Sequence, residues 1–476
     1  MPTRCIVHTL RDMHHTLTVI YILESMKHPI IIILLLTNLN IGFCQDKNLN
    51  QKLNSTIEAY QKVYDFSGTV KVVINTNNAF EKSYGFANRG FEIKNTPDTR
   101  FSINSISKTF TATAILILVE EGRIDINAPV TQYIPDLKRS WADSITVHHL
   151  LTHTSGLSRE SSIQPHEELT FKQQVKLVEK QTLLFNPGEK YEYSNAGIIL
   201  LGSIIENVSG MSYETFITKS IIQQLNLRNT GYYSGRNVIS KLAVPYRITS
   251  NGLEFAQRSK HYGDNAGGGL YSNPSDLFQF VKGLEDHIIL SKKYVDMMFQ
   301  SHVQSGKNAF EGYAWSIKYF GDEKLHFAAG SGYGTKSVII SMPESGDFIG
   351  ITSNWGNTPI LQLLSDLYLT IRNRDVELPS EDELANPDLY KNQIGAYIFH
   401  KEELAKHLGI NRDKILLQEV NGRLFLDDEL LAEGGDFLKL TYTNELKVEF
   451  SGDEMIININ GNIIKGNKLH TTLYKR

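Results

Sequence analysis

Apolar and polar residues alternate as in β-strands from Phe66 to Tyr84. The run Thr69–Ile74 is rich in β-branched residues, and Asn75–Asn78 supplies the polar residues of a turn. Ala79–Tyr84 continues the pattern, so this segment predicts a β-hairpin.

The next strong pattern, Ile106–Glu120, is apolar almost all the way round a helix. A helix that is apolar on every side lies buried in a protein core. Gly122 is a suitable residue to end it.

Helical and loop patterns continue to about Leu225, for example at Val175–Val178 and Ile198–Ile205. Strand patterns return further along, at Trp315–Tyr319, Val338–Met342 and Phe348–Thr352. Strands, a largely helical block and then more strands predict an α+β core with one antiparallel sheet. We assign residues 46–375 to this main domain.

A polar stretch with Pro379 and Pro387 follows, and we interpret residues 376–389 as a linker. Residues 390–476 then show short strands separated by turn signals such as Asn421-Gly422 and Asn460-Gly461-Asn462. This pattern predicts a β-rich accessory domain, a small barrel or sandwich.

Residues 1–45 are interpreted as an N-terminal extension and a signal peptide. Met26-Lys27-His28 gives a charged start, Pro29–Leu36 is apolar, and the small residues needed for cleavage lie at Gly42–Cys44. Met26 would be the true start. The alternatives are a retained anchor and a lipoprotein on Cys44, which the bulky Phe43 disfavours.

The only cysteines are Cys5 and Cys44, so the mature chain would have no thiol, as suits an exported, periplasmic or secreted protein. Membrane anchoring is the less favoured location. Hydrophobic residues make up 41% of the 476 residues, which argues against disorder. The net charge is −4, and basic residues do not cluster into a stripe along the sequence. We therefore expect no nucleic-acid partner.

Ser105-Ile106-Ser107-Lys108 places a serine and a lysine three residues apart at the start of the predicted buried helix. Residues at that spacing share one helix face, so the amine can reach the hydroxyl. Burial disfavours the charged form of an amine, which lets a lysine take the proton of a nucleophilic serine. By itself the motif is a weak signal, and without further context a solvated lysine beside a helix cap is the favoured explanation.

The wider context resembles the class C β-lactamase-related family of penicillin-recognising serine hydrolases. Phe101–Ala112 is similar to the first family motif, and Tyr193-Ser194-Asn195 is similar to the second. Further similar stretches are Glu120–Ile124, Tyr133–Leu137, His149–Leu157, Phe185–Glu189 and Gly267–Ser272 with Asp276. The resemblance implies an antiparallel sheet flanked by helices with an all-helical subdomain, and a C-terminal domain like the β-rich appendages of this family.

The resemblance also implies residue roles. Ser105 would be acylated, Tyr193 would act beside Lys108 as a general base, and Asn195 would orient the substrate amide and contact Lys108. Gly330 would let the backbone approach the ligand. The Ser331 N–H and the Ser105 N–H would form the oxyanion hole.

The third family motif departs from its pattern. The family usually has Lys or His two residues before the glycine, and this chain has Ala328 there. His326 would share that strand face and partly substitute, or it is an ordinary strand histidine. A missing cation disfavours true penicillin hydrolysis and favours an esterase or a peptidase.

His153 is interpreted as structural, at a helix end and turn. His148, His149 and His261 lack metal-ligand spacing with carboxylates, so we expect no metal and no cofactor.

The predicted function is an exported serine hydrolase acting on an amide or ester: a β-lactam, a D-amino-acid peptide or a small ester. Its expected partners are a small-molecule or peptide substrate and the cell envelope. The alternative is a catalytically weak or inactive member that binds ligands or acts as a sensor. An α/β-hydrolase is disfavoured, because no G-x-S-x-G elbow stands out.

Overall fold

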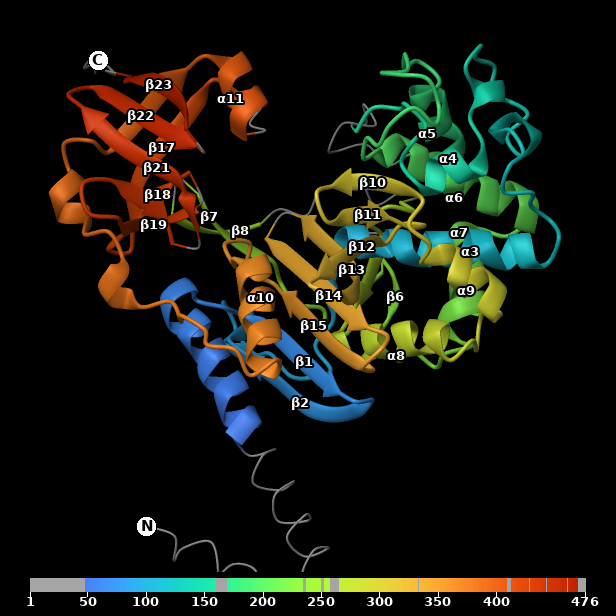
Figure 1. Ribbon diagram of the computed structural model, residues 1–476, viewed down its shortest axis with the longest axis horizontal. Coiled ribbons are helices and arrows are strands. Elements are labelled where there is room, and N and C mark those ends of the chain that lie inside the picture. The colour runs from blue at the N-terminus through green and yellow to red at the C-terminus, as the bar shows by residue number, and fades with distance from the viewer. Residues whose placement is uncertain are drawn as a thin grey trace, which may run out of the picture. The chain divides into compact units, whose positions relative to one another are not determined.

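The β-branched run Thr69–Ile74 lies in β1, the strand next to the edge strand β2 of a large antiparallel sheet in the computed structural model (Figure 1). Residues 1–47, which hold the predicted signal peptide, Cys5 and Cys44, lie outside the described residues. The elements below belong to the compact unit Leu53–Arg476. The structure describes residues 48–159, 169–233, 237–249, 252–256, 265–332, 334–408, 412–427, 429–441, 443–459 and 461–469.

The sheet has eight strands in the order β10-β11-β12-β13-β14-β15-β1-β2, each antiparallel to its neighbours. The predicted hairpin is β1 and β2, and the three later strand patterns are β12, β14 and β15. The bounds are β1 (Gly68–Ile74), β2 (Asn77–Tyr84), β10 (Val303–Gly306), β11 (Ala309–Glu311), β12 (Ser316–Phe320), β13 (Glu323–Gly332), β14 (Thr335–Met342) and β15 (Asp347–Ser353).

Both faces of the sheet are covered, which explains why β15 is buried at every position. Phe348 faces one side and joins the core that contains Phe110, whereas its neighbour Ile349 points to the other side. Helix α8 (Pro274–Glu285) packs on β15 and β1, and α10 (Ile360–Ile371) packs on β14 and β15.

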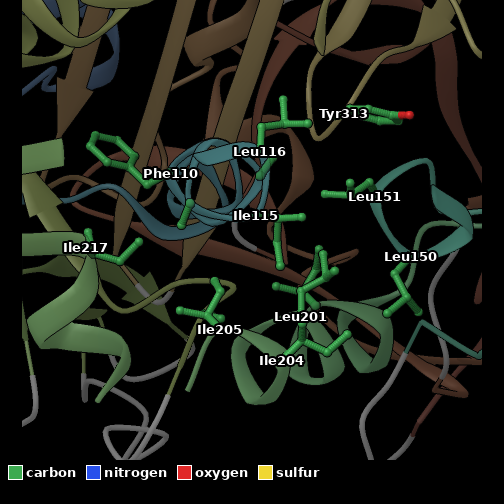
Figure 2. Close-up of a cluster of buried hydrophobic side chains, with 14 of the residues drawn as sticks. Phe110, Ile115, Leu116, Leu150, Leu151, Leu201, Ile204, Ile205, Ile217 and Tyr313 are labelled. Carbon is green, nitrogen blue, oxygen red and sulfur yellow. The ribbon is translucent and has the colours of Figure 1, made fainter. Parts of the chain in front are cut away.

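The predicted buried helix is α3 (Ser107–Glu120), and Gly122 follows it with a left-handed φ of 70°. Figure 2 shows its side chains Ile115 and Leu116 within an apolar cluster that includes Leu201. The other helices of this region are α4 (Val147–Leu151), α5 (Phe171–Val178), α6 (Asn195–Ser209), α7 (Tyr213–Ile217) and α9 (Lys292–Met298).

Among the described helices, none alone combines the length and apolar composition needed to cross a membrane. Helix α6 passes that test only together with Tyr213–Ile222, from which it is separated by a bend of 77°.

The C-terminal segment forms a closed barrel of eight strands, β16 to β23. Its interior is filled by buried apolar side chains such as Tyr397, Leu417, Leu431 and Val448. The predicted fold class, an α+β core with a small C-terminal all-β domain, is confirmed. The strand bounds are Gly395–Phe399, Lys414–Val420, Arg423–Leu426, Glu429–Glu433, Leu438–Leu440, Thr443–Ser451, Glu454–Ile459 and Asn462–Lys468.

One helix in this region, α11 (Lys401–Leu408), was not predicted. Leu404 is its one fully buried residue, so its apolar pattern is weak. The domain limits at 45, 375 and 389 stay predictions.

Phe110 is the side chain most suited to testing the packing of α3, because its ring stacks on Phe280 with centroids 3.9 Å apart and is fully buried. Phe110→Ala should lower the free energy of unfolding by about 3–5 kcal/mol, measured by urea titration. Phe91→Ala, at a side chain that is 80% exposed, should change it by no more than about 0.5 kcal/mol. Equal effects of the two substitutions would contradict this packing.

Candidate active site

The turn that carries Ser105 is held against the central sheet. Ser105 lies in a short 3-10 helix, Asn104–Ile106, directly before α3. Asn104 adopts a left-handed φ of 47°, which asparagine tolerates better than most residues, and its amide donates to Thr335 Oγ1 at 3.0 Å. Ser337 Oγ donates to the Ile103 carbonyl at 2.9 Å. Two side chains of β14, Thr335 and Ser337, therefore hold the turn by hydrogen bonds on both sides of Ser105.

Gly330 of β13 makes this close approach feasible. A Cβ at position 330 would lie 2.1 Å from the Ile103 carbonyl oxygen and 2.9 Å from the Ser105 nitrogen. Only a residue without a side chain fits there. Ser331 follows Gly330 in β13 and is exposed.

Lys108 lies in the first turn of α3 and is 3% exposed. Its Nζ donates to Ser105 Oγ at 3.0 Å and to the Gly267 carbonyl at 2.8 Å. The helical spacing thus places the amine on the hydroxyl. Sequence reasoning gave Gly267 no role, although it noted the Gly267–Ser272 stretch.

Tyr193 comes from the segment just before α6, and its hydroxyl donates to Ser105 Oγ at 3.1 Å. Its ring centroid lies 5.2 Å from Lys108 Nζ. Lys108 and Tyr193 therefore both donate hydrogen bonds to the same atom, Ser105 Oγ.

The His153 ring packs against the Tyr193 ring, with the two ring centroids 4.7 Å apart. The His153 Nδ1 accepts the Ser194 N–H at 3.2 Å. Burial, together with the nearby Lys108 charge, lowers the pKa of His153 to about 3, so the ring is neutral. Its hydrogen bond goes to the backbone, and it acts as a positioning residue.

Asn195 is the first residue of α6, and its N–H donates to the Arg159 carbonyl at 3.1 Å. The predicted contact with Lys108 is not formed as a hydrogen bond within the described part of the chain, where the ammonium bonds to Ser105 and Gly267 instead.

His326 does not replace the missing cation at Ala328. Its ring is 4% exposed and lies flat on Phe299, with centroids 3.8 Å apart. Burial lowers the pKa of His326 to about 3, which keeps the ring neutral. It is therefore an ordinary core histidine of the strand.

The remaining histidines of interest have structural partners. His149 Nδ1 accepts the Thr146 N–H at the start of α4, and His148 Nδ1 lies 2.9 Å from the Tyr313 hydroxyl. His261 lies outside the described residues. Within the described ranges, no group of three or more His, Cys, Asp or Glu side chains is arranged to hold a metal ion.

A family model described as Beta-lactamase matches residues 53–366. The chain belongs to the Beta-lactamase family. The match contains every residue of the site described above and ends before the C-terminal barrel.

Two curated proteins and one solved structure place this Beta-lactamase-family chain among its relatives. It is 27% identical over 336 residues to protein flp of Staphylococcus aureus (strain MRSA252), covering 68% of this chain and 66% of flp. It is 32% identical over 241 residues to the teichoic acid D-alanine hydrolase of Staphylococcus aureus, covering 50% of this chain and 59% of that protein. The chain thus spans less than two thirds of the length of these curated relatives.

The solved structure is the octameric penicillin-binding protein homologue from Pyrococcus abyssi. The TM-score is 0.63 at 25% identity, and the match covers 87% of this chain and 99% of that one.

Gly330→Ala should slow the reaction of Ser105 with an activated phosphonate about a hundredfold or more, because the new Cβ must displace the Ser105 turn. Labelling rates measured by intact-protein mass spectrometry test this. Gly306→Ala, in β10 of the same sheet, meets nothing closer than 3.5 Å and should leave the rate unchanged. An unaffected rate in Gly330→Ala would refute the close approach.

The buried neutral histidines should make the protein less stable in acid. His153 and His326 have pKa values lowered from 6.5 to about 3, so below pH 6.5 the unfolded chain binds protons that the folded chain does not. The free energy of unfolding should therefore fall as the pH falls from 6.5 toward 3, by up to about 1.4 kcal/mol per pH unit for each histidine.

Urea titrations at pH 7, 6 and 5 measure this slope. His326→Leu should make the slope shallower by the share of one histidine, since carboxylates contribute equally in both proteins. An identical slope in the two proteins would contradict a neutral, buried His326.

Proposed function

We propose that this chain is an exported serine hydrolase that forms an acyl-enzyme on Ser105 and cleaves D-amino-acid amides or esters. The observation that carries the proposal is the pair of hydrogen bonds received by Ser105 Oγ, from Lys108 at 3.0 Å and Tyr193 at 3.1 Å. A serine becomes a nucleophile when such neighbours take its proton.

In the first step, Ser105 Oγ forms a bond to the substrate carbonyl carbon while its proton passes to the Tyr193 oxygen, which acts as the general base in its deprotonated form beside the Lys108 ammonium. The carbonyl oxygen becomes negative and accepts hydrogen bonds from the backbone N–H groups of Ser105 and Ser331. Tyr193 then returns the proton to the leaving amine or alcohol as its bond to the carbonyl carbon breaks. Asn195, at the start of α6, orients the substrate amide.

In the second step, water attacks the ester that links the acyl group to Ser105. Its proton passes to Tyr193 and then to Ser105 Oγ, which leaves as the hydroxyl when the acid is released. The neutral His153 holds the Tyr193 ring without adding a charge beside Lys108.

The substrate class rests on two supports. Ala328 leaves the strand without the Lys or His that would bind a penicillin carboxylate there. The similar Staphylococcus aureus protein is named for hydrolysis of D-alanine from teichoic acid. We therefore place D-amino-acid esters and amides ahead of β-lactams, and the cell envelope as the setting.

A second candidate function, a ligand-binding or sensory protein without turnover, is favoured by Ala328 alone. A panel of p-nitrophenyl esters and D-alanyl peptides separates the two. Turnover that disappears in Ser105→Ala supports the hydrolase, and binding of the same compounds without turnover supports the second function.

Ser105→Ala should lower turnover by roughly a thousandfold or more, because the reacting oxygen is removed. An activated phosphonate should add to the wild-type chain at Ser105, located by peptide mass spectrometry. Ser140→Ala, at an exposed serine, should keep full turnover and labelling. Wild-type turnover in Ser105→Ala, or an adduct elsewhere, would end the proposal.

A further inference from the structure

Glu311, the last residue of β11, is a buried carboxylate that takes no part in the proton transfers at Ser105. The residue is 8% exposed, and its two carboxylate oxygens accept the Ser316 hydroxyl at 3.1 and 3.0 Å. A second serine hydroxyl, that of Ser305, also donates to it. A carboxylate offers about four lone-pair positions to donors, so two hydroxyl groups leave part of its acceptor capacity unused.

Among the described residues, no Lys or Arg side chain forms an ion pair with Glu311. Lys318 of β12 adds positive charge nearby, but its Nζ lies over the Phe327 ring, 3.7 Å from the centroid. Burial raises the pKa of Glu311, although the serine hydroxyls and the Lys318 charge act to lower it. A buried carboxylate is costly unless a cation is paired with it, so a cation bound at Glu311 would offset that cost.

Strand register places Glu311 on the same face of the sheet as Ser331. Glu311 pairs with Ser316, which in turn pairs with Phe327, and directly paired residues share a face. Phe327 and Ser331 are four positions apart on β13 and therefore share that face too, with the small Ala329 between them. Four residue rises along β13 and two strand spacings across the sheet put the Cα atoms of Glu311 and Ser331 about 16 Å apart.

Tyr191 links Glu311 to the segment that carries the catalytic phenol. Burial, and after it the negative charge of Glu311, raise the pKa of Tyr191 above its usual range. The Tyr191 ring centroid lies 6.2 Å from that of His153, whose ring packs against Tyr193. Glu311 is therefore within electrostatic reach of the loop that completes the active site.

We propose that Glu311 binds a primary ammonium at the far end of the substrate, so that the enzyme selects substrates with a distal amine. This inference rests on the proposed hydrolase function. With the reacting carbonyl held at the Ser331 N–H, an ammonium on the adjacent carbon cannot span the distance to Glu311, whereas one on a flexible chain of about four or more carbons can. The N–H donors of an ammonium match the unused acceptor positions of the carboxylate. Ala328 adds no positive charge that would repel such a group.

The test uses two pairs of D-amino-acid esters in which one member carries a terminal ammonium that the other lacks. The methyl esters of D-lysine and D-norleucine form the first pair, and the aminohexyl and hexyl esters of D-alanine form the second. The wild type should have a higher kcat/KM for the ammonium-bearing member of one or both pairs. The pair that responds tells whether the cation belongs to the acid or to the alcohol of the ester.

Glu311→Gln should lower kcat/KM for the preferred ammonium-bearing ester about tenfold or more, mainly through KM, and leave its partner within twofold. The amide keeps the size of the side chain and an oxygen acceptor for the serine hydroxyls. Glu311→Asp should recover part of the difference, because it keeps the charge on a shorter chain. Glu285→Gln is the matched control, since Glu285 of α8 is a partly buried carboxylate that accepts the Ser341 hydroxyl at 2.5 Å. It should leave both preferences unchanged.

The ratio of kcat/KM within a pair, measured on one preparation, does not depend on how much of a variant is folded. An equal loss on both members in Glu311→Gln would make Glu311 a structural residue of the β11–β12 hairpin, and unchanged ratios would remove it from the site; either result overturns the inference. Hydrolysis of all the esters by the wild type without preference would leave the hydrolase standing without this specificity. Failure of the wild type to hydrolyse any of them would overturn the proposed hydrolase as well.

Discussion

The site depends on one close contact between backbones, the approach of the Ser105 turn to Gly330. The absence of a side chain at Gly330 lets the Ile103 carbonyl and the Ser105 nitrogen settle on β13. Ser337 and Thr335 then hold the turn by hydrogen bonds. This contact fixes the position of the helix that carries Lys108 relative to the strand that carries Ser331. The sheet is thus the rigid element against which the reactive hydroxyl is placed.

The second constraint is electrostatic. Lys108 is buried, and a buried ammonium is costly unless its donors find acceptors. The Ser105 hydroxyl and the Gly267 carbonyl are such acceptors. His153, whose pKa is about 3, adds no competing charge beneath the phenol. Arg159 adds positive charge only at the solvent side. The Tyr193 ring therefore has two cations near its centroid, the buried Lys108 at 5.2 Å and the exposed Arg159 at 5.1 Å.

Local features of this fold could be predicted from the sequence because neighbouring residues encode them. The apolar run of α3 and the hairpin of β1 and β2 follow from periodicity, and the Ser105–Lys108 contact follows from helix geometry. Tyr193 lies far along the chain, so only its resemblance to a family motif placed it near Ser105. The short helix α11 was not predicted, because Leu404 is its one buried residue and its apolar pattern is therefore weak.

Contacts made by tertiary packing could not be predicted. Nothing in the sequence around Gly267 says that its carbonyl, rather than Asn195, receives the Lys108 ammonium. The stacking of His326 on Phe299 depends on where α9 ends relative to β13. The same holds for Arg159, whose neighbour Tyr193 is brought close only by the docking of two loops. In each case, two distant segments have to be placed before the contact exists.

The pairing of β1 with β15 has a consequence for how the molecule is made. Ser353, at the end of β15, bonds to Ser67, from which it is 286 positions away along the chain. During synthesis, β1 has only β2 beside it until nearly all of the family region has left the ribosome. Contacts that close so long a loop form slowly. The chain therefore stays without its finished sheet until β15 has been made, and up to that point a polypeptide can still be threaded through a narrow pore.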